Sequence, residues 1–133
     1  MIRAKGDACA TQLEPNSFDL VFSNSVIEHV GDINKQTAFA TEARRLAPRH
    51  WIQTPAKSFP IEAHTGMPFW WYYPKTTRTR IVKRWRAKLP DWTEMVEGTT
   101  FVEKRTLRSY FPESQLLVER FAGLPKSYVA WKA

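Results

Sequence analysis

The chain has 133 residues and a formal net charge of +7, with 43% hydrophobic and 14% aromatic residues. This length allows one domain, and the apolar content is sufficient for a folded core. The single cysteine, Cys9, excludes an internal disulfide framework, and the spacing of cysteine and histidine does not match a zinc tetrad. No apolar run approaches the roughly 20 residues that span a membrane. We therefore expect a globular protein in the cytoplasm.

The positive charge is concentrated in the later part of the chain. Five of the 20 basic residues precede Arg49, whereas six of the 13 acidic residues do so. An anionic partner should therefore meet the region after Arg49.

The first element is short and ends at Gly6-Asp7-Ala8. Residues 2–8 are predicted to form the end of a strand and a loop, because turn-forming residues follow at 10–16. Asp7 is either an exposed loop residue or a ligand contact.

The most informative stretch is residues 18–30. An apolar run, Phe18 to Phe22, leads into the small polar residues Ser23, Asn24 and Ser25, and Val26-Ile27-Glu28-His29-Val30 follows. Continuous apolar runs are typical of buried parallel strands, and ligands of open α/β sheets bind beyond the carboxyl ends of such strands. The run predicts a strand that ends at a functional edge. His29 is either a structural hydrogen-bonding residue or a general base.

A helix and a second strand are predicted next. Asp32 is a good N-cap, the helix covers residues 33–47 with apolar side chains on one face, and Pro48 ends it. Residues 51–54 form a short strand closed by Pro55, which completes a strand–helix–strand unit with a right-handed connection.

The segment after this strand carries Glu62 and His64. The two residues alternate, so they share a face of an extended chain and are candidates for substrate binding. The spacing also suits two metal ligands, but no third and fourth partners are evident, so no metal site is expected. The aromatic run 69–73 is expected to pack as part of a lid.

The remaining elements are a basic helix, a short helix and two strands. Residues 75–89 carry basic side chains and a narrow apolar stripe, a pattern that suits packing on the protein itself or, alternatively, on a membrane surface; nucleic acid is disfavoured. Residues 91–105 are expected to be irregular, 106–111 helical, and 115–121 and 127–131 a closing pair of strands.

These motifs resemble those of class I S-adenosylmethionine-dependent methyltransferases of type 11. Phe18-Asp19-Leu20-Val21 leading to Glu28-His29-Val30 resembles the fourth-strand motif of this family, and Gly6-Asp7-Ala8 resembles the end of its third strand. The resemblance implies that Asp7 accepts a hydrogen bond from the adenine amine of the cofactor, with the Ala8 amide serving the ring. It also implies that the cofactor is lined by Ser23, Asn24 and Ser25. Residues 58–74 resemble the segment that follows the fifth strand in a branch of the family.

One feature of the family is missing from the sequence. Its first strand is followed by a glycine-rich loop and its second strand closes with an acidic residue, but the five glycines here are scattered. The resemblance therefore covers the later part of the family's domain. It implies an α/β fold, a partial Rossmann-like sheet with strands equivalent to 3, 4, 5, 7 and 6 and the last strand antiparallel, in a single incomplete domain over 1–133. Residues 59–105 form an insertion or lid between the fifth and sixth strands.

The leading functional hypothesis is methyl transfer from S-adenosylmethionine to a small or lipid-linked acceptor, with His29 as the candidate catalytic residue. The activity is expected to need the part of the domain that this sequence does not show, and the isolated chain is expected to bind the cofactor weakly. The alternative is a non-catalytic interaction subunit that uses the basic helix or the exposed edge of the first strand. That edge is expected to be covered by a second copy, by a complementing chain, or by residues 2–5 folding back.

Overall fold

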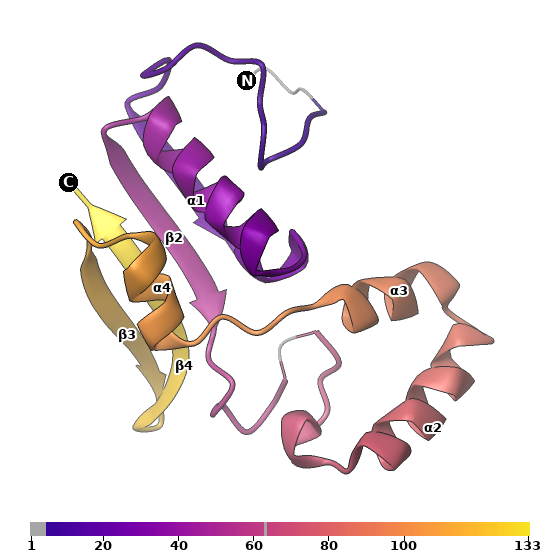
Figure 1. The fold of residues 1–133 in the computed structure, drawn as a ribbon. Helices are drawn as coiled ribbons and strands as arrows, with labels where there is room; N and C mark the ends of the chain where they lie inside the picture. Colours follow the sequence, from indigo (N-terminus) through magenta and orange to yellow (C-terminus); the bar gives the residue numbers. More distant parts are fainter. Residues whose placement is uncertain (1–4, 63) are drawn as a thin grey trace.

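The computed structural model describes residues 5–62 and 64–133. Its centre is one four-stranded sheet in the order β1-β2-β4-β3 (Figure 1). β1 and β2 are parallel, and β4 is antiparallel to both β2 and β3. The strands are β1 (Leu20–Asn24), β2 (Arg49–Pro55), β3 (Gln115–Phe121) and β4 (Leu124–Lys132). The α/β class and the antiparallel last strand are confirmed.

The order corresponds to strands 4, 5, 7 and 6 of the family's sheet. The strand end and loop predicted for residues 2–8 fall partly outside the described residues, since 2–4 are not described. Residues 5–8 form no strand and end in a turn, which agrees with the predicted loop, and the described residues show no strand there.

α1 (Ile33–Leu46) connects β1 to β2 across one face of the sheet (Figure 1). It begins where predicted, because the Asp32 carboxylate accepts hydrogen bonds from the amides of Asn34 and Lys35 at 3.1 and 3.0 Å. α4 (Lys104–Tyr110) covers the same face beside α1. The core between these helices and the sheet contains Ile27, Phe39, Ala40, Ala43, Ile52, Val102, Leu107, Tyr110, Phe111 and Ala130.

The face away from α1 is less well covered. On β1, Leu20 is 50% exposed and Phe22 is 65% exposed, and no strand pairs with the outer edge of β1 among the described residues. The expected exposed apolar edge is therefore present. It leaves backbone donors and acceptors beside apolar side chains, the combination that favours pairing with another chain.

Between β2 and α4 the chain forms a helical excursion that extends away from the sheet (Figure 1). It contains η2 (Trp70–Tyr72), α2 (Lys75–Arg86) and α3 (Pro90–Gly98). The basic helix is confirmed. The prediction of an irregular segment over 91–105 is wrong for residues 91–98, which belong to α3, whereas residues 99–103 are irregular as predicted. α2 ends at Arg86, and Pro90 occupies the first turn of α3, where a missing amide donor costs nothing.

The closing hairpin is tighter than predicted. A turn at Ala122 and Gly123, with φ of 48° and 80°, joins β3 to β4 directly. Two positive φ values are the signature of the tight turn that matches the twist of an antiparallel pair. β4 therefore begins at Leu124 and not at residue 127.

Candidate functional site

The carboxyl ends of β1 and β2 are tied together by Ser25 and Gln53. Ser25 has a left-handed backbone, with φ of 54°. Its amide donates to the carbonyl of Gln53 at 3.1 Å, and its hydroxyl donates to Gln53 Oε1 at 3.1 Å. This fixes the small polar residues at the carboxyl end of β1 at the edge where the sequence predicted a functional site.

The short helix η1 (Ile27–His29) then buries Glu28 beneath this edge. Ile27 is fully buried and anchors the turn, and the Glu28 side chain is 3% exposed. Glu28 Oε2 accepts a hydrogen bond from Thr54 Oγ1 at 3.0 Å, while Oε1 has no hydrogen-bond partner. Burial raises the pKa of Glu28. Thr54 belongs to β2, so both strand ends contribute to this position.

The segment after β2 brings Glu62 and His64 to the same place. Glu62 Oε2 accepts hydrogen bonds from the backbone amides of His64 and Thr65, and Glu62 Oε1 lies 2.8 Å from His64 Nδ1. Burial alone would raise the pKa of Glu62, but these hydrogen bonds lower it overall. The hydrogen bond that His64 donates to Glu62 raises the pKa of His64. The two residues expected to share a face are in direct contact.

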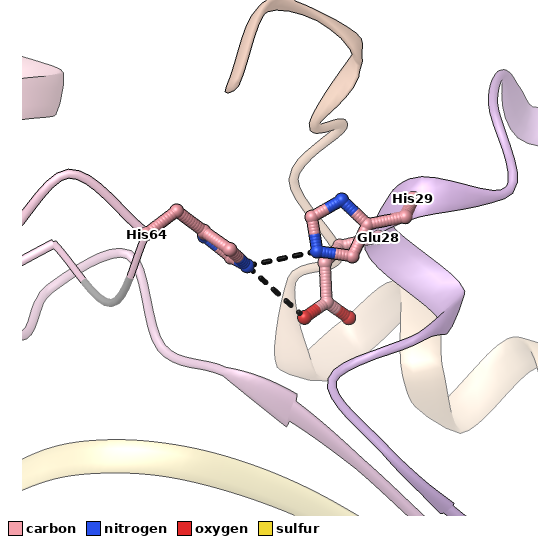
Figure 2. A group of neighbouring side chains, drawn as sticks. All are labelled: Glu28, His29 and His64. Carbon is pink, nitrogen blue, oxygen red and sulfur yellow. Dashed lines mark hydrogen bonds and ion pairs between the residues drawn. The ribbon is translucent and has the colours of Figure 1, made fainter. Parts of the chain in front are cut away.

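His64 also meets His29, although 35 residues separate them in the sequence. The two Nε2 atoms are 2.8 Å apart, and the rings are nearly perpendicular, with centroids at 4.5 Å (Figure 2). His29 Nδ1 lies 3.2 Å from Thr99 Oγ1, just beyond the end of α3. Burial, and then the nearby His64, lower the pKa of His29. Both ring nitrogens of His29 thus have a polar atom within 3.2 Å.

A cavity of about 850 Å³ opens beside these side chains. Four of the site residues predicted from the sequence line this cavity: Asn24, Ser25, Glu62 and His64. The cavity is also lined by three residues that the sequence analysis did not predict as site residues: Glu28, Gln53 and Thr54. Gln53 and Thr54 close the second parallel strand, so the rule that identified residues 23–25 would also have found them.

Other chosen residues lie elsewhere. Ser23 is buried and its hydroxyl has no partner. Asp7 is exposed; its carboxylate accepts the Cys9 amide at 2.8 Å and lies 3.6 Å from Lys35 Nζ. The amide of Cys9, more than Lys35, lowers the pKa of Asp7. Asp7, Ala8, Ser23 and His29 do not line the cavity in the described structure, so their assigned roles stay predictions.

The basic helix α2 packs on its own protein. Trp85 of α2 stacks on Trp70, with ring centroids at 5.2 Å, and meets Trp92 of α3 edge-on at 4.9 Å. Most cationic side chains of α2 are exposed, and Arg86 pairs with Glu97, but Arg78 is half-buried with its guanidinium 5.7 Å from the centroid of the Trp71 ring. Among the described residues, no helix has the length and apolar content to cross a membrane.

A protein-family model matches the first part of the chain. Residues 3–52 match the family model described as a methyltransferase domain. The matched residues include β1, α1 and the first residues of β2, which is the part of the chain where the sequence resembles methyltransferases.

One solved structure similar to this chain is a SAM-dependent methyltransferase from Methanosarcina mazei. It shares 15% sequence identity, with a TM-score of 0.47, over 96% of this chain. The chain spans 65% of the length of that protein. A search of curated proteins found no match.

Proposed function

We propose that this chain forms the acceptor-facing part of an S-adenosylmethionine-dependent methyltransferase site. The observation that carries the proposal is the cavity at the carboxyl ends of β1 and β2, formed in part by the segment that matches a methyltransferase domain. Ligands of open α/β sheets bind at such ends. Asn24, Ser25, Glu62 and His64 all line this cavity. On this proposal Asn24 and Ser25 contact the cofactor, and Glu62 and His64 contact the acceptor. We further propose a cytoplasmic location, supported by the single cysteine.

The chemistry proposed for the cavity is alignment. Methyl transfer requires the nucleophile, methyl carbon and sulfur to lie in line, and positioning alone supplies a large part of the rate. The lining mixes polar side chains with the apolar rings of Phe22, Trp51 and Phe121, which suits a small or lipid-linked acceptor. His29 faces His64 and not the cavity, so general-base catalysis by His29 has no support from the geometry.

The proposal requires a glycine-rich segment in addition to the printed residues, because the ribose and methionine contacts of the family belong to that part of the domain. The isolated 133-residue chain should therefore bind S-adenosylmethionine weakly or not at all. Calorimetry on the purified chain measures this, and submicromolar affinity would show that the printed residues suffice.

A positive test begins with the nucleotides upstream of the Met1 codon, read in frame for a glycine-rich segment. The chain extended through that segment should bind S-adenosylmethionine. Asn24→Leu should weaken binding by roughly tenfold, the worth of about one hydrogen bond. Asn34→Leu, at an exposed position on α1, is the matched control. An extended chain that binds no cofactor, or binds it equally well with Asn24→Leu, contradicts the proposal.

A second candidate function is that of a non-catalytic interaction subunit. The outer edge of β1, with Leu20 and Phe22 exposed, favours it. On this proposal the edge pairs with a second copy or a complementing chain, and the cationic face of α2 serves a membrane surface. The absence of an in-frame glycine-rich segment upstream would favour this candidate over the first.

A further inference from the structure

We propose that Glu28, His29 and His64 bind a divalent transition-metal ion, with zinc as the preferred ion. One ligand atom from each residue lies within 4.8 Å of the other two. The Nε2 atoms of His29 and His64 are 2.8 Å apart, and His64 Nε2 lies 3.9 Å from Glu28 Oε1 (Figure 2). From sequence spacing, Glu62 was the only candidate to share a metal with His64, whereas in the fold the two partners of His64 are Glu28 and His29 of η1.

The hydrogen bond at Nδ1 fixes the tautomer of His64. Glu62 is a carboxylate that already accepts two backbone amides, and a carboxylate only accepts hydrogen bonds. His64 Nδ1 must therefore carry the hydrogen in its contact with Glu62, at 2.8 Å. In the neutral ring, Nε2 is then a bare lone pair.

The tautomer of His29 follows from Thr99. The Thr99 hydroxyl donates its hydrogen to the carbonyl of Met95 at 2.9 Å, so toward His29 it acts as an acceptor. His29 Nδ1 donates, and His29 Nε2 is left with a lone pair as well. Two lone pairs then face each other at 2.8 Å. Such a contact is repulsive unless a proton or a cation lies between the two nitrogens.

Glu28 adds the evidence for a cation. Its side chain is nearly fully buried, Oε2 is held by Thr54, and Oε1 has no hydrogen-bond partner. A buried polar atom without a partner is costly, and a carboxylate oxygen is more costly than a neutral one. A divalent ion at this point satisfies Oε1 and both Nε2 lone pairs together.

The donor set and its surroundings match known zinc chemistry. Two histidines and one glutamate form a three-residue set that leaves a fourth position open. Tetrahedral zinc with ligands at about 2.0–2.1 Å keeps them roughly 3.3 Å apart, and the 2.8 and 3.9 Å distances bracket that value. Metal-binding histidines donate their other ring nitrogen to a fixed acceptor, as these donate to Glu62 and Thr99. Because Glu28 and His64 line the cavity, a molecule held there can supply the fourth ligand.

The inference does not depend on methyl transfer, because it concerns only groups of this chain. The test uses the 133-residue protein, freed of metal with a chelator and then titrated with zinc chloride and with cobalt chloride at neutral pH. We expect one zinc ion per chain by elemental analysis and calorimetry. Cobalt should give the visible absorption bands of a tetrahedral site, and zinc should remove them.

Variants assign the ligands. His29→Ala, His64→Ala and Glu28→Gln should each weaken zinc binding. Thr99→Val removes the acceptor of the hydrogen bond from His29 Nδ1 and should weaken zinc binding by roughly 10–100-fold. The two histidine variants should lose more affinity than Thr99→Val does. Cys9→Ser and His50→Asn, which change the remaining thiol and imidazole, should bind zinc as the parent does. Circular dichroism establishes that each variant is folded.

Two results would overturn the proposal. The first is a folded protein that takes up no zinc, which would mean that the two histidines share only a proton. The second is zinc binding that persists in the double variant His29→Ala/His64→Ala or disappears in Cys9→Ser, which would place the ion elsewhere.

Discussion

Glu42 and Arg45 of α1 hold the segment before β1 against the helix, and this contact should make stability depend on pH. Glu42 Oε1 accepts the backbone amide of Thr11 at 2.9 Å and also its hydroxyl. The Arg45 guanidinium lies 2.8 Å from both carboxylate oxygens and donates to the carbonyl of Leu13. The pKa of Glu42 is lowered from 4.5 to about 2, first by the hydrogen bonds from Arg45 and then by those from Thr11.

The shift sets both the sign and the size of the effect. Because the folded-state pKa lies below the unfolded-state value, the stabilisation is fully present above about pH 4.5. It is lost as the pH falls toward about 2. A shift of this size corresponds to about 3.5 kcal/mol at roughly 1.4 kcal/mol per pKa unit. The Arg45 side chain is 32% exposed, so water screens the pair and we expect about 1–2 kcal/mol.

The measurement compares the parent with Glu42→Gln by urea unfolding at pH values from 7 to 2. At pH 7 the variant should be less stable by about 1–2 kcal/mol, and the gap should close as the pH approaches 2. Glu94→Gln, at an exposed position on α3, controls for the loss of a carboxylate. A gap that stays constant over this range would refute the reasoning, because the loss would then be one of packing and not of ionisation.

Three further predictions concern the cofactor, the sheet edge and the core. Asp7→Ala should weaken S-adenosylmethionine binding by the extended chain by about 1.5–3 kcal/mol, measured by calorimetry. Unchanged affinity would mean that Asp7 is an exposed loop residue that does not contact the cofactor. Leu20→Lys should convert dimers or aggregates of the chain into monomers, as measured by light scattering. Ile33→Lys, at a residue that is also exposed but lies away from the edge, should not. A parent protein that is already monomeric would contradict the need for a partner. Phe111→Ala should lower the free energy of unfolding by about 3–5 kcal/mol in urea, because Phe111 is fully buried. A loss below about 1 kcal/mol would mean that the core closes around the space left by the phenyl ring.

The sequence located one side of the candidate site. The apolar run before Ser23, the small polar residues after it and the alternation of Glu62 with His64 are local patterns, and each predicted a residue near the cavity edge. Period-two alternation in a strand decided which of them reach it. Asn24 lines the cavity, whereas its neighbour Ser23 is buried. A shift of two residues in the observed bounds of β1 relative to the prediction did not alter this edge.

The sequence by itself determined those elements whose signals lie within one short segment. The Asp32 cap began α1, the apolar runs made the strands, and the residues around Gly123 closed the hairpin. Tertiary structure decided what meets across the chain. The contact of His29 with His64 spans 35 residues and that with Thr99 spans 70, and the burial of Glu28 depends on Thr54 of another strand. No spacing in the sequence encodes such contacts, because they form only when the segment after β2 and the end of α3 pack against η1.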